Sequence, residues 1–332
     1  MNPPDPATAR PDYASLQQAA EWFAVLSSGT ATEQQRQYWQ SWLDARVEHR
    51  NAWARVEGIN QRLDTLGTAM DQHTAASTLQ TATKTVRMRR RSLGTLGALF
   101  ALLIGGKLIH GLPPVRHTLA AWRADYRTGI GEQFSTELAD GSHLWLDTDS
   151  AADVHYDGQL RRIILHGGAL LVRTAPDTAR RPLVVDTRHG RLLALGTWFS
   201  VRHNDGHIHL SVFEGTVEIQ PANPGAATQR VATGQQASFT HDASGPLQPL
   251  AQPRPQWQDG LLIADEMPLA DFLAELGRYR RGHLGCAPEV AHLKVVGAYP
   301  LHDTDRALEL LATALPLRIR RTLPWWVTLE AR

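Results

Sequence analysis

The sequence has almost no cysteine, and this limits its covalent chemistry. Its 332 residues include one cysteine, Cys286, so no disulfide can form within a single chain. A lone cysteine is more often a small packed side chain than a nucleophile. Charge of either sign is not in excess either, because the net charge is only +1. Direct binding of nucleic acid, which needs a concentrated basic face, is therefore not expected.

Motifs for common catalytic and cofactor chemistry are also missing. The sequence contains no H-E-x-x-H, no G-x-S-x-G, no phosphate-binding loop and no dinucleotide glycine fingerprint. The best metal candidates, His203, His207 and His209, flank Asn204-Asp205-Gly206, a strong hairpin-turn signal. Alternation along the strands would divide these histidines between two faces, so a surface hairpin is favoured over a metal site. We expect no metal, no cofactor and no enzymatic turnover.

The first 66 residues predict a short disordered tail followed by a helical unit. Residues 1–12 are polar and rich in proline. Apolar residues then recur at helical spacing over 14–28 and again over 49–63, within a helical head spanning residues 13–66. Thr32 begins T-E-Q-Q, in which Thr32 can cap a helix and Gln35 can reach back to it.

The next segment predicts a membrane crossing. Residues 67–92 read as a linker that ends in a basic cluster formed by Arg87, Arg89, Arg90 and Arg91. Residues 93–112 are apolar apart from Lys107, which lies near the far end, where its ammonium can reach the interface. Twenty helical residues span about 30 Å, the thickness of the hydrocarbon core. A buried core helix is the alternative interpretation.

The arginines predict the orientation of that segment. Basic residues on one side of a membrane helix stay in the cytoplasm, so the head is expected inside and the rest of the chain outside. Arg90-Arg91 also resembles a twin-arginine export signal, which leaves the route of export open.

The remaining sequence predicts two further domains. Residues 113–243 contain short runs of period two bounded by turn signals such as Asp140-Gly141 and Glu214-Gly215, which indicate an all-β sandwich or roll. Residues 244–256 form a second linker, and residues 257–332 alternate strand and helix patterns typical of a small α+β domain. The predicted fold class is therefore multidomain: an all-α cytoplasmic head, one transmembrane helix, an all-β periplasmic domain and a C-terminal α+β domain.

Several ordered motifs resemble the FecR family of transmembrane anti-sigma regulators. The matching residues fall in all three predicted domains: Ala20-Glu21-Trp22, Trp39, Trp42-Leu43 and Trp53 in the head; Asp140-Gly141-Ser142, Leu195-Gly196-Thr197, Phe199 and Glu214-Gly215-Thr216 in the β domain; Trp257, Gly260, Arg278-Tyr279 and Gly297 in the tail. The tail is also similar to the short domain at the N-termini of secretins and of TonB-dependent signalling receptors.

The resemblance implies a signalling function rather than catalysis, in a single-pass protein of the bacterial inner membrane with its N-terminus in the cytoplasm and its C-terminus in the periplasm. It implies that the head binds an extracytoplasmic-function sigma factor and that the tail receives a signal from a TonB-dependent outer-membrane receptor, in the uptake of a ferric siderophore or chelate. Membrane-embedded and periplasmic proteases would release the head. A periplasmic binding or assembly module that is tethered to the membrane, without sigma control, is the alternative function.

Candidate site residues follow from the same resemblance. Sigma-binding candidates are Trp22, Trp39, Trp42, Leu43 and Trp53, with a purely structural core as the alternative for some of them. Receptor-contact candidates are Trp257, Arg278 and Tyr279. Some FecR-like proteins cut themselves at a Gly-Thr bond, which here is Gly196–Thr197. The alternative is that Gly196 forms a tight turn and Thr197 is an ordinary strand residue.

Overall fold

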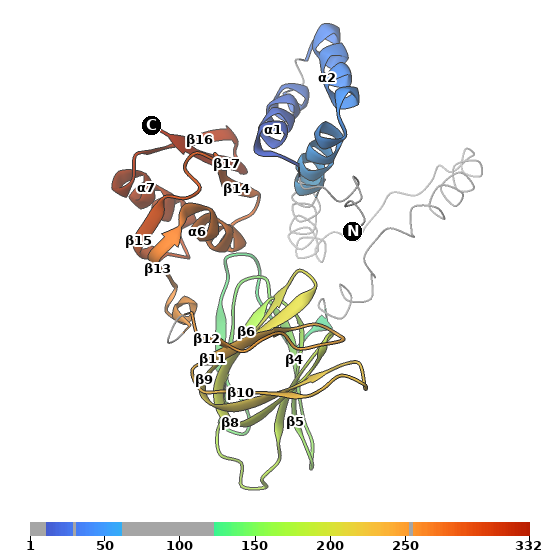
Figure 1. Ribbon diagram of the computed structural model, residues 1–332, viewed down its shortest axis with the longest axis vertical. Helices are drawn as coiled ribbons and strands as arrows, with labels where there is room; N and C mark the ends of the chain where they lie inside the picture. The colour runs from blue at the N-terminus through green and yellow to red at the C-terminus, as the bar shows by residue number, and fades with distance from the viewer. Residues whose placement is uncertain (1–10, 29–30, 62–122, 252–254) are drawn as a thin grey trace, which may run out of the picture.

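Short helices come first in the chain, and strands make up most of the structure after them (Figure 1). The computed structural model describes residues 11–28, 31–61, 123–251 and 255–332. The helices are α1 (Tyr13–Ser27), α2 (Glu33–Ala45) and a third helix over residues 47–61. The predicted cap of the second helix is confirmed, because the Thr32 side chain accepts from the Gln35 backbone while the Gln35 side chain accepts from the Thr32 backbone.

These helices do not form the self-sufficient all-α head that the sequence predicts. The apolar side chains buried among these described helices are small, namely Ala19, Ala20, Ala52 and Val56, and Trp326 from the C-terminal part completes their cluster. Arg320 pairs with Glu21 at 2.6 Å across the same contact. The predicted head is wrong because short helices with small buried residues cannot exclude enough water by themselves.

The predicted fold class also includes one transmembrane helix, at residues 93–112. Among the helices that the structure describes, none is long and apolar enough to cross a membrane. The segment for which that helix was predicted, residues 93–112, lies outside the described residues. The linker that carries Arg87, Arg89, Arg90 and Arg91 lies outside them too.

Strands β1 to β12 share one hydrogen-bonded sheet that curls around a single core (Figure 1). The strands are β1 (Tyr126–Arg127), β2 (Phe134–Glu137), β3 (His143–Leu146), β4 (Ala151–Tyr156), β5 (Arg161–Gly167), β6 (Ala169–Arg173), β7 (Leu183–Thr187), β8 (Gly190–Asn204), β9 (His207–Pro221), β10 (Gln229–Ala232), β11 (Gln235–Phe239) and β12 (Gln248–Pro249). Along β5, every second residue from Arg161 to Leu165 is buried, as the alternating pattern requires for a strand with one face on a core.

The long hairpin of β8 and β9 connects the two halves of this β body. The first part of β8, residues 190–194, pairs with β7, whereas residues 198–202 pair with β6. On β9, residues 208–212 pair with β11 and residues 216–219 pair with β10. Both strands therefore change partners at facing positions, β8 between residues 194 and 198 and β9 between residues 212 and 216. Gly196-Thr197 on β8 and Gly215 on β9 lie at this corner.

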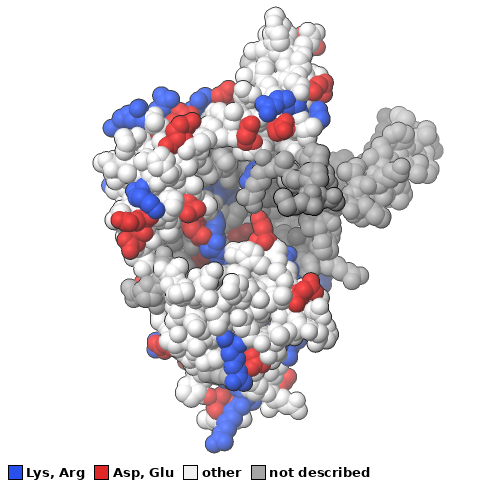
Figure 2. Space-filling view, viewed as in Figure 1, with Lys and Arg blue, Asp and Glu red and all other residues white. Residues whose placement is uncertain are grey.

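The C-terminal part is a separate small core made of helices and two small sheets. Its elements are β13 (Leu261–Pro268), α6 (Leu269–Leu276), β14 (His283–Cys286), β15 (Lys294–Pro300), α7 (Thr304–Ala314), β16 (Leu317–Leu323) and β17 (Trp326–Ala331), with short 3-10 turns at Gln256–Asp259 and Gly277–Tyr279. Strands β13 and β15 pair, and β14, β17 and β16 form the other sheet. On the face shown in Figure 2, acidic and basic side chains are interspersed over this part.

Candidate functional site

The Gly196–Thr197 peptide bond lies in a β-bulge at the corner of the β8–β9 hairpin. The pairing register shifts between Leu195 and Trp198, so residues 196 and 197 are displaced from the regular ladder. Gly196 has a φ of 66°, in the left-handed region that favours glycine. The sequence alternative of a tight turn is thus replaced by a bulge in the middle of a long strand.

Thr197 is buried in this bulge, and its hydroxyl makes no hydrogen bond with the described residues. The residue is only 4% exposed, and its Oγ1 has no hydrogen-bond partner among the described residues. A buried hydroxyl without a partner costs about 1–3 kcal/mol, and Thr328 Oγ1 in β17 is another such group among the described residues. The Thr197 methyl group faces Gly215 on the opposite strand.

The backbone of Thr197 is held from the side by Thr174, the residue that follows β6. The Thr197 backbone N–H donates to Thr174 Oγ1 at 2.7 Å. The Thr197 carbonyl oxygen accepts from the Thr174 backbone N–H at 2.9 Å and from its hydroxyl at 3.2 Å. One threonine therefore fixes both backbone polar groups of the bulged residue, while the Thr197 side-chain oxygen makes no hydrogen bond with the described residues.

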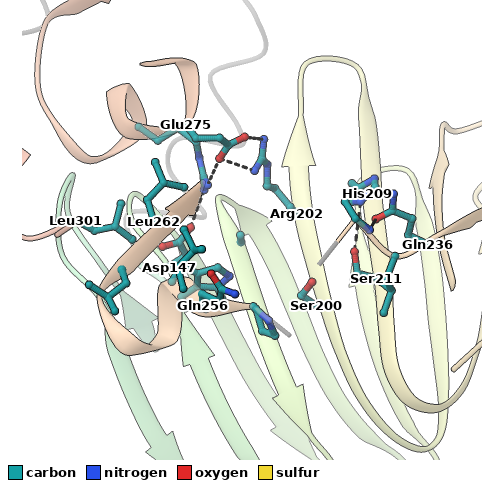
Figure 3. Close-up of a pocket in the computed structure, with 18 of the residues that line it drawn as sticks. Asp147, Ser200, Arg202, His209, Ser211, Gln236, Gln256, Leu262, Glu275 and Leu301 are labelled. Carbon is teal, nitrogen blue, oxygen red and sulfur yellow. Dashed lines mark hydrogen bonds and ion pairs between the residues drawn. The ribbon is translucent and has the colours of Figure 1, made fainter. Parts of the chain in front are cut away.

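A second candidate site is the junction between the β body and the C-terminal part (Figure 3). Asp147, which follows β3, has a side chain that is 1% exposed. Its carboxylate accepts from Arg278 Nη2 at 2.8 Å and from the Tyr279 hydroxyl at 2.6 Å. Nearby, Arg202 of β8 binds both oxygens of Glu275 from α6, at 2.7 and 2.9 Å. Two charged contacts thus join the two parts.

The charges at this junction stabilise each other. Burial would raise the pKa of Glu275, but the hydrogen bonds and charge of Arg202, together with the charge of Arg278, lower it overall. Burial and the Asp147 charge both raise the pKa of Tyr279, so its hydroxyl remains a donor. Two of the predicted receptor-contact residues, Arg278 and Tyr279, are therefore engaged with the β body in this structure. The third, Trp257, accepts from Gln133 Nε2 through its backbone oxygen at 2.7 Å.

A cavity of about 270 Å³ lies beside these contacts. The β body lines it with polar side chains (Figure 3). Ser200, Ser211 and Gln236 lie opposite one another on neighbouring strands, and Arg202 lies opposite His209 in another cross-strand row. The C-terminal part lines its other side with apolar residues such as Leu262 and Leu301, together with the charged Glu275 and Arg278. The C-terminal part therefore faces these polar side chains of the β body across the cavity.

The three histidines of the hairpin are not brought together as ligands. His209 lies in the floor of the cavity and contacts Ser238 and Ser211, and burial lowers its pKa. His203 contacts the Leu165 carbonyl oxygen, whereas His207 contacts Asn204. No group of three or more potential metal ligands occurs in the part of the chain that the structure covers.

The predicted sigma-binding residues lie on the N-terminal helices and are half-buried. Trp39 packs on Trp53 with ring centroids 4.9 Å apart, and Trp42 stacks on His49 at 4.4 Å. The Trp42 indole N–H donates to Gln18 at 2.7 Å. Trp22 and Leu43 are half-buried as well. The indoles thus contribute to helix packing and still expose part of their rings.

Sequence reasoning missed three residues that organise these sites. Thr174, Asp147 and Glu275 each act on a residue far away in the chain, and none belongs to a motif. A weak signal existed for Asp147, since a carboxylate directly after the strand-like run His143–Leu146 lies at an end of a sheet.

Comparisons with known proteins agree with the motifs. Residues 124–218 match the family described as FecR protein, and residues 17–59 match a domain of unknown function called DUF4880. No curated protein matches the chain. Two crystal structures of a protein described as a candidate anti-sigma factor from Parabacteroides distasonis are similar, at 19% identity and TM-scores of 0.48 and 0.49, over 62% of this chain and 98% of theirs. The predicted FecR resemblance is confirmed over the matched residues.

Proposed function

We propose that this protein, whose β body carries a FecR domain, regulates a sigma factor. The observation that supports this most is that two matched segments occur in one chain: residues 17–59 on the aromatic-rich helices and residues 124–218 on the β body. The half-buried tryptophans on the helices have the character of an interface anchor, because indole rings that pack on one side can contact a partner on the other.

The finer proposal is that the C-terminal part receives a signal from a TonB-dependent receptor and passes it to the β body. The buried contacts of Asp147 with Arg278 and Tyr279 support this, because they couple the position of the C-terminal part to that of the β body. A partner that displaces the C-terminal part must break these contacts, so the receptor signal has a physical route to the FecR domain.

Capture by the full-length chain tests the sigma-factor proposal. Purified full-length protein is mixed with the extracytoplasmic-function sigma factors of its own genome, and binding is measured for the wild type and for Trp53→Ala and Trp39→Ala. Circular dichroism checks that each variant is folded. Trp145→Ala in the β body is the matched control, because it removes an indole outside the helices.

We expect one sigma factor to be captured, with weaker binding for the variants of the helices and unchanged binding for Trp145→Ala. Capture of no sigma factor by the wild type would contradict the proposal. The tethered binding module without sigma control would then be the better interpretation.

The Thr197 hydroxyl, which is buried and has no hydrogen-bond partner among the described residues, supports a second function. We propose that the Gly196–Thr197 bond is cut once by the chain itself. Thr197 Oγ1 attacks the Gly196 carbonyl carbon, the bond from that carbon to the Thr197 nitrogen breaks, and water hydrolyses the resulting ester. Nucleophilic attack by threonine has a physical basis here, because Oγ1 is buried without a hydrogen-bond partner among the described residues and Gly196 has no β-carbon to obstruct its carbonyl carbon.

Fragment analysis tests this second function. The wild type and Thr197→Ala are expressed and compared on a denaturing gel. Two fragments in the wild type and a full-length Thr197→Ala chain are expected. A wild type that stays full-length removes the proposal, whereas equal cutting in both chains assigns it to an outside protease.

A further inference from the structure

We infer that the Thr174 hydroxyl is a catalytic group in the cleavage of the Gly196–Thr197 bond; this inference rests on the self-cleavage proposed above. Its Oγ1 lies 2.7 Å from the Thr197 nitrogen, which is the atom that must leave when the bond breaks. Thr174 therefore contacts a reacting atom directly, although it lies 23 residues away in the sequence.

Thr174 is fixed in place by the strands around it. The preceding residue, Arg173, pairs with Trp198 at the end of the β6–β8 ladder. The following residue, Ala175, donates its backbone N–H to Ser142 Oγ at 2.9 Å. Because both neighbours are held, the Thr174 side chain does not need to be ordered at the moment of reaction.

The orientation of the Thr174 hydroxyl makes it an acceptor toward the nitrogen. Its own proton is directed to the Thr197 carbonyl oxygen, which lies 3.2 Å away. The oxygen lone pairs are consequently left to the Thr197 N–H. A threonine hydroxyl has one donor and two acceptor positions, so both contacts can exist at once.

The proton balance of the reaction shows when this contact matters. Thr197 Oγ1 loses one proton as it bonds to the Gly196 carbonyl carbon, and the Thr197 nitrogen gains one proton as its bond to that carbon breaks. No proton is gained or lost overall in forming the ester. Between the two events the nitrogen becomes a cationic amine that is still attached to the tetrahedral carbon.

Hydrogen bonding to the cationic nitrogen is stronger than to the neutral amide. The contact from nitrogen to Thr174 Oγ1 therefore strengthens on the way to the transition state, which is the condition for lowering a barrier. The nitrogen belongs to Thr197, which is only 4% exposed, and this burial increases the difference, whereas Gly196 on the other side of the bond is exposed. Without the Thr174 hydroxyl, positive charge would develop on the Thr197 nitrogen without this hydrogen-bond acceptor.

A structural role alone is the competing explanation, because a bulged N–H needs some partner. The two roles differ in their response to side chains that preserve or remove the acceptor. Thr174→Ser keeps the hydroxyl, whereas Thr174→Val keeps the shape and removes it. Thr174→Cys keeps a group of similar size but is a poor acceptor, and it serves if the valine variant does not fold.

A suitable control contacts the same corner without reaching the nitrogen. Thr233 donates its hydroxyl to the Gly215 carbonyl oxygen at 3.0 Å, on the opposite strand of the bulge. Thr233→Val therefore removes one hydroxyl contact near the site and leaves the reacting atoms untouched.

The experiment follows full-length chains made by cell-free translation, and it measures the rate at which fragments appear after synthesis is stopped. We expect Thr174→Val and Thr174→Cys to slow cleavage by about tenfold or more, the size of a lost charge-assisted hydrogen bond. Thr174→Ser is expected to stay within about threefold of the wild type, and Thr233→Val to cleave at the wild-type rate.

The outcomes separate this inference from the one it rests on. Cleavage of Thr174→Val and Thr174→Cys at the wild-type rate, with Thr197→Ala uncut, overturns the role of Thr174 and leaves self-cleavage in place. A slow Thr174→Ser chain would also overturn it, because the acceptor is preserved there. A wild type that never cleaves overturns the proposed self-cleavage itself.

Discussion

Gly215 faces Gly196 across the β8–β9 hairpin, so closely that a β-carbon on Gly215 would overlap the Gly196 carbonyl oxygen. The backbone of Gly215 is also left-handed, with a φ of 80°. Two glycines are thus required on opposite strands for different reasons: Gly215 for space as well as conformation, and Gly196 for conformation alone, since nothing lies within 4 Å of a β-carbon added there.

Gly215→Ala is expected to destabilise the protein by roughly 2–4 kcal/mol, because it adds a steric overlap to the cost of a left-handed alanine. Urea denaturation measures the change in the free energy of unfolding. Gly206→Ala is the matched control, since Gly206 has a φ of 79° and a β-carbon added there would meet nothing within 4 Å. The control should cost only about 1 kcal/mol, and equal costs for both variants would refute the close packing of Gly215.

Thr197→Val is expected to stabilise the protein by about 1 kcal/mol while preventing self-cleavage. Valine has nearly the shape of threonine and removes the buried hydroxyl that has no partner. Denaturation midpoints and gel analysis measure the two effects. Thr328→Val provides the comparison, because Thr328 Oγ1 is also buried without a partner among the described residues but lies in β17. Thr328→Val should be more stable than the wild type, and its Gly196–Thr197 bond should still be cleaved as in the wild type.

Breaking the contact of Asp147 with Arg278 should destabilise the protein by about 3 kcal/mol, since an unpaired charge would remain buried. Unfolding of Arg278→Ala, Asp147→Ala and the double variant gives the coupling energy between the two residues. The exposed pair of Arg306 and Glu309, 3.1 Å apart, should show a coupling below about 1 kcal/mol. Similar couplings in both cycles would contradict the importance of the junction.

Stability should fall in acid partly because of His283. Burial, with a smaller contribution from Arg55, lowers the pKa of His283 to about 4 in the folded protein. The unfolded chain binds the proton near a pKa of about 6.5. The contribution of neutral His283 to the free energy of unfolding is therefore complete above about pH 6.5 and is lost as the pH falls toward 4.

Phenylalanine at position 283 tests that dependence. His283→Phe keeps a ring to stack on Trp326, whose centroid lies 3.9 Å from that of His283, and removes the titration. Denaturation at several pH values should show a flatter acid limb for the variant between pH 6.5 and 4. Parallel curves for wild type and variant would contradict the assignment.

The sequence predicts much of the local structure, because local structure depends on neighbours in the chain. The alternation in Arg161–Gly167 and the capping residues Thr32 and Gln35 are both found in the structure as strand and cap. The turn signal Asp205-Gly206 lies between β8 and β9 as expected. These features are decided within a few residues by periodicity, hydrogen bonding and glycine conformation.

Long-range relationships could not be predicted in this way. Nothing near Thr197 indicates that Thr174 would bind its nitrogen, because that contact depends on how β6 aligns with β8. Tyr279 looks like an exposed candidate for a partner, yet Asp147 binds it from 132 residues away. The helices likewise look like an independent head until Trp326 is seen to complete their core.

The way β8 is shared between two halves of the β body also decides how a cut chain would bear tension. After a cut at Gly196, residues 190–194 stay with the first fragment but still pair with β9 of the second. Residues 198–202 belong to the second fragment but still pair with β6 of the first. A pull along the strands would load these hydrogen bonds together in shear, so the fragments would separate in one cooperative step. After the cut, hydrogen bonds between strands, rather than a covalent bond, would set the force at which the two fragments separate.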